Sequence, residues 1–135
     1  MFASRPRPGW EEDREALIAA LRALAPARTL DVACGTGYLT RWLPGELTGL
    51  DQSESMVAIA SARVPGGRFV VADALTLPFA DGEFERVFTG HFYGHLEEAA
   101  RVRFLEEARR VGEEWSSPTR RCGPITSPWS GRSAS

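Results

Sequence analysis

Three aspartates and two glycines are the residues of this 135-residue chain whose types and spacing point to chemistry. Asp51 and Asp73 lie at the ends of short apolar segments, and Asp31 lies within another, twenty residues before Asp51. Gly35 and Gly37 lie in "LDVACGTG", between an apolar run and an amphipathic one. Glycine lets the backbone turn tightly and approach a ligand without a Cβ in the way, and the amides of such a loop face the ligand. A Gly-x-Gly pair alone also suits a plain tight turn, so the acids decide the interpretation.

The elements that must position these residues alternate between strands and helices. Apolar residues at helical spacing predict helices over 10–24, 38–43, 53–64 and 95–111, with Ser53 as an N-cap. Short apolar runs predict strands over 28–33, 47–51, 67–74 and 85–92. This alternation predicts an α/β fold, a Rossmann-like three-layer sandwich whose mostly parallel sheet has the order 3-2-1-4. The carboxyl ends of its strands, where such sheets bind ligands, then bring the three acids to one edge.

Each acid has its own use at that edge. A carboxylate at Asp51 can accept from both hydroxyls of a ribose. Asp73 can accept from an adenine amino group, while the amide of Ala74 donates to a ring nitrogen. Asp31 lies at the entrance of the glycine loop, where its charge repels a pyrophosphate and attracts the ammonium of an amino acid. Because Thr40 stands where a dinucleotide fingerprint has its third glycine, the sequence favours a nucleoside that carries an amino acid.

Four segments carry a family resemblance: "LDVACGTG", "GLDQSESM", "VVADALTLPFADGEFERVF" and "FLEEARRV". Over residues 29–114 the chain resembles the small-molecule branch of the class I S-adenosylmethionine-dependent methyltransferases. The resemblance implies S-adenosyl-L-methionine as cofactor, S-adenosyl-L-homocysteine as product and a small-molecule methyl acceptor. It implies cofactor contacts in three groups: Asp31, Ala33, Gly35 and Gly37 at the methionine end, Asp51 and Gln52 at the ribose and adenine, and Asp73 and Ala74 at the adenine. Met56 either packs against the adenine or belongs to the core.

One position departs from the family pattern. Residue 33 is an alanine where the family usually has glycine, and an alanine serves there if its φ is negative.

The resemblance also directs attention to the loop after the fourth strand, which in this family faces the reacting methyl group. That loop reads "TGHFYGHL", and its candidate proton acceptors and donors are His91, Tyr93 and His95. We predict His91 and His95 as catalytic candidates. The alternatives are that His95 caps the helix that follows and that His91 is a half-buried residue with its hydrogen bonds satisfied. Cys34 is expected to pack within the glycine loop, and two cysteines predict no metal cluster.

The chain changes character after Glu114. Residues 115–135 contain six serines, three prolines and no acid, which predicts an irregular tail outside the family pattern, following an S-adenosylmethionine-binding domain over 1–114. The family's last strands are then missing, and we expect a homodimer through the exposed edge of the fourth strand. The tail is either natural or the product of one base lost near codon 115. With serine codons of the TCN type, reading from one base earlier encodes Leu, Met or Val at 115, Val at 116 and an apolar residue at 117. Resequencing the gene decides between the two.

Composition limits the remaining functions. A net charge of −2 gives no electrostatic case for nucleic acid or an acidic membrane, and no apolar run reaches the length of about 18 residues that a membrane span needs. We expect a cytoplasmic enzyme that transfers methyl groups to a small molecule, impaired by its altered end. A non-catalytic fragment that binds S-adenosylmethionine or a nucleoside and self-associates is the first alternative, and a nicotinamide-dependent oxidoreductase is the second.

Overall fold

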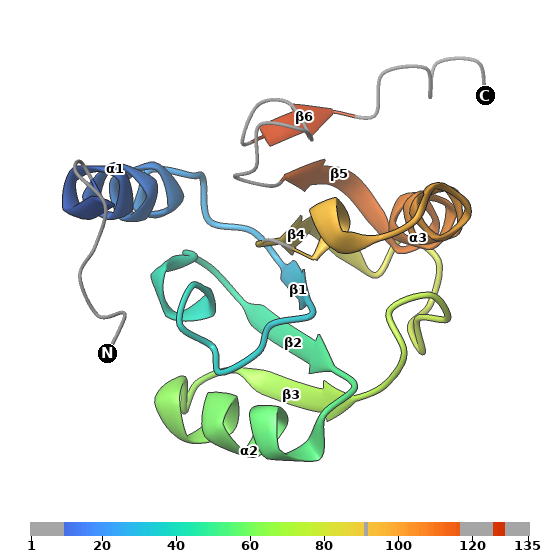
Figure 1. Ribbon diagram of the computed structural model, residues 1–135, viewed down its shortest axis with the longest axis horizontal. Helices are drawn as coiled ribbons and strands as arrows, with labels where there is room; N and C mark the ends of the chain where they lie inside the picture. The colour runs from blue at the N-terminus through green and yellow to red at the C-terminus, as the bar shows by residue number, and fades with distance from the viewer. Residues whose placement is uncertain (1–9, 91, 117–125, 129–135) are drawn as a thin grey trace.

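The computed structural model describes residues 10–90, 92–116 and 126–128. A six-stranded sheet of order β3-β2-β1-β4-β5-β6 forms its centre (Figure 1). Its first five strands run parallel to one another and the sixth runs antiparallel to the fifth. The strands are β1 (Thr29–Val32), β2 (Leu47–Asp51), β3 (Arg68–Val71), β4 (Phe84–Thr89), β5 (Gly112–Ser116) and β6 (Thr126–Pro128).

Helices cover both faces of the sheet (Figure 1). One face carries α1 (Trp10–Arg22), the 3₁₀ turn η1 (Thr40–Trp42) and α2 (Glu54–Arg63). The other carries α3 (Glu98–Val111) and the long connection from β3 to β4. The main apolar cluster lies under α3 and a smaller one lies under α1. Because both faces are covered, every residue of β1 is buried, as are five of the six residues of β4.

Local signals explain where the helices begin and end. The hydroxyl of Ser53 accepts a hydrogen bond from the amide of Met56, which confirms it as the N-cap of α2. Glu98 lies in the first turn of α3 and Arg109 and Arg110 in its last, which is the arrangement that a helix dipole favours.

The expected order of the first four strands is confirmed, and the element boundaries differ in detail. Only Thr40–Trp42 of the predicted helix over 38–43 is helical, as a 3₁₀ turn, since Pro44 and Gly45 leave no room for a longer helix. The strand predicted over 85–92 ends at Thr89, because the chain turns into a second 3₁₀ turn, η2 (Tyr93–His95).

The sheet continues beyond β4, which corrects the expectation that the last strands are missing. Gly112–Ser116 forms β5, which pairs parallel with β4. Thr126–Pro128 forms β6, which pairs antiparallel with β5. The predicted boundary at residue 114 therefore falls inside a strand. Gly112 allows the pairing because a Cβ at this position would lie 2.5 Å from Val87 Cγ2. Strand preference depends strongly on the surroundings, so the polar segment "GEEWS" still forms a strand beside β4.

No helix among the described residues has the length and apolar character needed to cross a membrane.

Candidate functional site

The glycine loop leaves the carboxyl end of β1 and leads to η1. Gly35 and Gly37 both have positive φ, +58° and +80°. A Cβ on Gly37 would lie 3.1 Å from Ala60 of α2, so this glycine lets the loop pack against the helix. A Cβ on Gly35 would meet no atom of the described residues within 4 Å. The backbone at Gly35 is therefore open to close approach by a ligand.

Asp51, the last residue of β2, holds this loop in place. Its Oδ2 accepts a hydrogen bond from the Gly35 amide at 2.9 Å, and its Oδ1 accepts from the Ser53 amide at 3.0 Å. The two residues that the sequence placed at one edge of the sheet are thus in direct contact. Each carboxylate oxygen keeps a lone pair for a further donor, so the group can still accept from a ligand hydroxyl.

Asp31 lies deeper in the sheet than its predicted position at the loop entrance. It pairs in register with Gly49, two residues before Asp51, and its side chain is only 3% exposed. The Thr40 hydroxyl donates to its Oδ2 at 2.6 Å. Burial raises the pKa of Asp31, the Thr40 hydrogen bond opposes this and the nearby Asp51 charge adds to it, so that the pKa is about 7. Asp31 is therefore the last residue but one of β1 and is buried, whereas Asp51 ends β2 and is half-buried.

Ala33 begins the loop with a φ of +59°, in the left-handed region. The condition under which an alanine was expected to serve at this position, a negative φ, is therefore not met. Glycine adopts this left-handed conformation without strain, whereas the Cβ of Ala33 makes it strained.

Cys34 lies inside the loop, and its sulfur would be 3.1 Å from a Cβ on Gly49. Burial, and after it the charges of Asp31 and Asp51, raise the pKa of its thiol to about 12. The group is therefore a neutral thiol at physiological pH, as a packing role requires.

Asp73 follows β3 and caps a turn of its own. Its Oδ1 accepts from the Leu75 amide at 2.9 Å, and its carbonyl accepts from the Thr76 amide at 3.1 Å. One residue earlier, the Ala72 amide donates to the Asp51 carbonyl at 3.1 Å. The start of the turn is therefore fixed to the end of β2, beside the glycine loop.

The other residues predicted on this side have different surroundings. Gln52 and Asp73 are exposed, whereas Met56 and Ala74 are half-buried. Ala74 packs against the main apolar cluster. The backbone amide of Met56 donates a hydrogen bond to the Ser53 hydroxyl.

Of the two predicted catalytic histidines, His91 lies outside the described residues. His95 is exposed at the end of η2, and the N-cap of α3 is Glu97, so His95 does not cap that helix. Tyr93 of the same turn is half-buried, with the Arg101 guanidinium 5.3 Å from its ring centroid.

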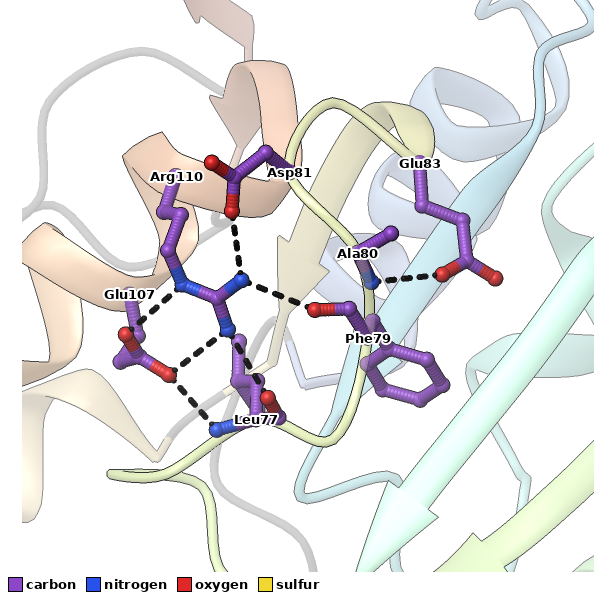
Figure 2. Close-up of polar contacts among 7 residues, drawn as sticks. All are labelled: Leu77, Phe79, Ala80, Asp81, Glu83, Glu107 and Arg110. Atoms are coloured by element: carbon purple, nitrogen blue, oxygen red, sulfur yellow. Dashed lines mark hydrogen bonds and ion pairs between the residues drawn. The ribbon is translucent and has the colours of Figure 1, made fainter.

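Sequence reasoning missed Glu107 and Arg110 of α3, which bind the backbone of the β3–β4 connection (Figure 2). Their spacing of three residues on one helix signals an ion pair, but nothing in the sequence indicates the loop as their partner. No group of His, Cys, Asp and Glu among the described residues is arranged to hold a metal ion.

Relatives of known name match most of this chain. Over 103 residues it is 37% identical to the demethylmenaquinone methyltransferase of Thermotoga maritima, a match that covers 73% of this chain and 44% of the relative. Over 98 residues it is 40% identical to phthiotriol/phenolphthiotriol dimycocerosates methyltransferase 1 of Mycobacterium ulcerans, covering 65% of this chain and 34% of the relative. The chain therefore spans less than half the length of these two relatives.

Among solved structures, the PH0226 protein of Pyrococcus horikoshii superposes with a TM-score of 0.69 at 26% identity, over 85% of this chain and 58% of that one. The family model described as "Methyltransferase domain" matches residues 30–114, a range that includes the glycine loop, Asp51 and Asp73. The chain thus belongs to the methyltransferase domain family, and its fold is the Rossmann-like fold of the class I S-adenosylmethionine-dependent methyltransferases.

Proposed function

We propose that this protein transfers the methyl group of S-adenosylmethionine to a small-molecule acceptor. The observation that carries the proposal is the contact between the Asp51 carboxylate and the Gly35 amide, 2.9 Å apart. It places an acceptor for ribose hydroxyls beside backbone that is open to a ligand. The named relatives support the acceptor class, since demethylmenaquinone and the phthiotriols are small molecules.

The residues present fit this cofactor. The positive φ of Gly35 and the open space at its missing Cβ make room for a ligand at the loop. Asp51 and Asp73 offer acceptors for a ribose and for an adenine amino group, and the amide of Ala74 offers a donor. Asp31, buried behind the loop, adds negative potential where a cationic amino acid is expected. We keep two further predicted residues in this proposed site: Gln52, which follows Asp51 directly, and Met56, which lies in α2.

When bound, the cofactor supplies an electrophilic methyl group on a sulfonium ion. The chain then has to hold both reactants in line and keep their reacting atoms in contact. His91 and His95 stay our candidates for accepting the proton of the methyl acceptor. His95 is exposed on a turn next to the carboxyl end of β4, where it can reach a ligand.

Two further expectations stay part of this proposal, a cytoplasmic location and a homodimer. The homodimer was predicted from an unpaired edge at the fourth strand, and β5 and β6 pair that edge. The edge strands of the described sheet are β3 and β6, so a homodimer that pairs sheet edges would use one of these.

Titration calorimetry with S-adenosylhomocysteine and with NAD tests the binding half of the proposal. We expect the wild-type chain to bind S-adenosylhomocysteine and not NAD. Asp51→Asn removes the charge that accepts from two ribose hydroxyls, so its affinity should fall by about tenfold or more. Glu46→Gln is the matched control, because it removes one exposed carboxylate just before the opposite end of the same strand and should leave affinity unchanged.

Transfer of a labelled methyl group to a panel of acceptors that includes demethylmenaquinone tests the catalytic half. Thermal melting of each variant first establishes that it is folded. NAD binding in place of S-adenosylhomocysteine, or unchanged affinity in Asp51→Asn, would overturn the proposed site. Cofactor binding without transfer to any acceptor would contradict the proposed activity.

A further inference from the structure

Two side chains of α3 bind a loop that is distant from them in sequence. Glu107 and Arg110 lie three residues apart near the end of the helix, and Figure 2 shows both turned toward residues 77–81 of the β3–β4 connection. The Glu107 carboxylate and the Arg110 guanidinium meet through two hydrogen bonds, of 3.0 and 3.1 Å. We refer to these two residues as the α3 pair.

The α3 pair satisfies the loop backbone at several points. Glu107 accepts from the Leu77 amide at 2.7 Å, and Arg110 donates to the carbonyls of Leu77 and Phe79 at 2.9 and 2.8 Å. Arg110 also donates to the Asp81 carboxylate at 2.8 Å. These bonds fix the path of a segment that has no regular secondary structure.

The carboxylate of the α3 pair is buried, so it needs these hydrogen bonds to stay charged. Glu107 is only 7% exposed, so its charge depends on its partners. The hydrogen bond from Arg110 lowers the pKa of Glu107 against the effect of burial, and the Leu77 amide lowers it further. The carboxylate thus stays ionised as an acceptor for both the loop and the arginine.

The segment that the α3 pair holds follows the proposed adenine contacts, Asp73 and Ala74, in the same connection. Upstream, the Ala72 amide is bonded to Asp51, and the turn that follows is capped by Asp73. Downstream, the first bond to the α3 pair is at Leu77. Residues 73–76 are therefore anchored at one end by β2 and at the other by α3.

From this geometry we infer that Glu107 and Arg110 are positioning residues for recognition of the adenine 6-amino group. They act through the loop, by fixing where Asp73 and Ala74 face the base. This inference rests on the proposed cofactor site and adds the residues that determine its base specificity. The nucleobase class that they select is a 6-aminopurine over a 6-oxopurine.

The test compares two ligands that differ at one position of the base. S-adenosylhomocysteine carries a 6-amino donor, whereas S-inosylhomocysteine carries a 6-oxo acceptor, which the Asp73 carboxylate repels. We expect the wild-type chain to prefer the adenosyl ligand by about tenfold or more in titration calorimetry. In Glu107→Gln, which keeps the shape but removes the charge, that preference should fall by about fivefold or more.

Glu106→Gln provides the matched control. Glu106 neighbours Glu107 on α3, is exposed, and forms a long ion pair with Arg103, at 3.8 Å. We expect this variant to keep the wild-type preference. Arg110→Lys serves as a second variant, because it keeps the charge but loses the fork that reaches both carbonyls, and its preference should also fall.

The ratio of the two affinities separates a positioning role from a merely structural one. Partial unfolding lowers the apparent affinity for both ligands equally and leaves the ratio unchanged. An unchanged ratio in folded Glu107→Gln, or in folded Arg110→Lys if the first variant does not fold, overturns the inference. Failure of the wild-type chain to bind either ligand instead overturns the proposed function.

Discussion

Ala33 shows how one residue can report on a backbone turn. With a φ of +59° it occupies a region that costs a residue with a Cβ about 1–2 kcal/mol. The same turn at Gly35, with a φ of +58°, carries no such cost. The loop therefore keeps a strained residue at its first position.

Replacing Ala33 by glycine should raise the free energy of unfolding by about 0.5–1 kcal/mol, since relief of strain outweighs the added freedom of the unfolded chain. Urea denaturation measures the change. Ala58→Gly, at an exposed position within α2, is the control and should lower stability by about 1 kcal/mol. A lower stability of Ala33→Gly would show that the alanine Cβ contributes packing that outweighs its strain.

Asp31 makes stability depend on pH. Its pKa is raised to about 7 by burial, whereas the unfolded chain has the ordinary value near 3.8. A raised pKa of an acid favours folding only while the group is protonated, so this contribution is complete below pH 3.8 and is lost as pH rises through 7. The loss is on the order of 4 kcal/mol.

Asp31→Asn keeps an oxygen for the Thr40 hydroxyl and removes this titration. We expect the variant to match the wild-type chain near pH 4 and to exceed it in stability at pH 8, in urea denaturation at a series of pH values. Parallel curves for the two chains across this range would contradict the assignment of the slope to Asp31.

At the scale of elements, β5 depends on a buried ion pair. Arg86 of β4 donates through Nε to Glu114 of β5 at 3.0 Å, and the arginine side chain is only 4% exposed. The two residues also lie opposite each other in the parallel register. This pair links the polar fifth strand to the apolar core.

Glu114→Ala should lower the free energy of unfolding by about 3 kcal/mol, because it leaves the Arg86 charge buried without its carboxylate. Adding Arg86→Met should restore most of the loss, and a double-mutant cycle in urea measures the coupling. A cost below about 0.5 kcal/mol for the single variant would mean that the pair does not hold β5 to the sheet.

The elements that the sequence predicted well have strong local signals. Strands β1 to β4 are short apolar runs, and α2 begins at a serine cap, so alternation and capping were enough to give their order. The segment "GEEWS" lacks such a signal, and its pairing comes from Gly112 and from the Arg86–Glu114 contact across the sheet. Contacts of this kind form only when distant segments meet.

The candidate site follows the same division. That Gly35 and Asp51 would share one edge followed from strand order, and the structure brings them to 2.9 Å. Loop geometry, which residue types do not predict, determines three other features. These are the burial of Asp31, the φ of Ala33 and the hydrogen bond from the Leu77 amide to Glu107.

For the whole molecule, we predict that the residues after Glu114 are the main departure from the family pattern. Ser116 in β5 is 1% exposed, and its hydroxyl has no hydrogen-bond partner within the described part of the chain. A buried parallel strand ordinarily carries an apolar residue there, and the shifted reading frame encodes valine at 116. The lost base stays a prediction that resequencing checks.

The bond between Gly35 and Asp51 belongs to the protein's own fold, so the loop has its shape before any ligand arrives. Its amide proton should then exchange slowly with deuterium in the free protein. Capture of a nucleoside needs no slow rearrangement of this loop, and the observed association rate should rise in proportion to ligand concentration without reaching a plateau.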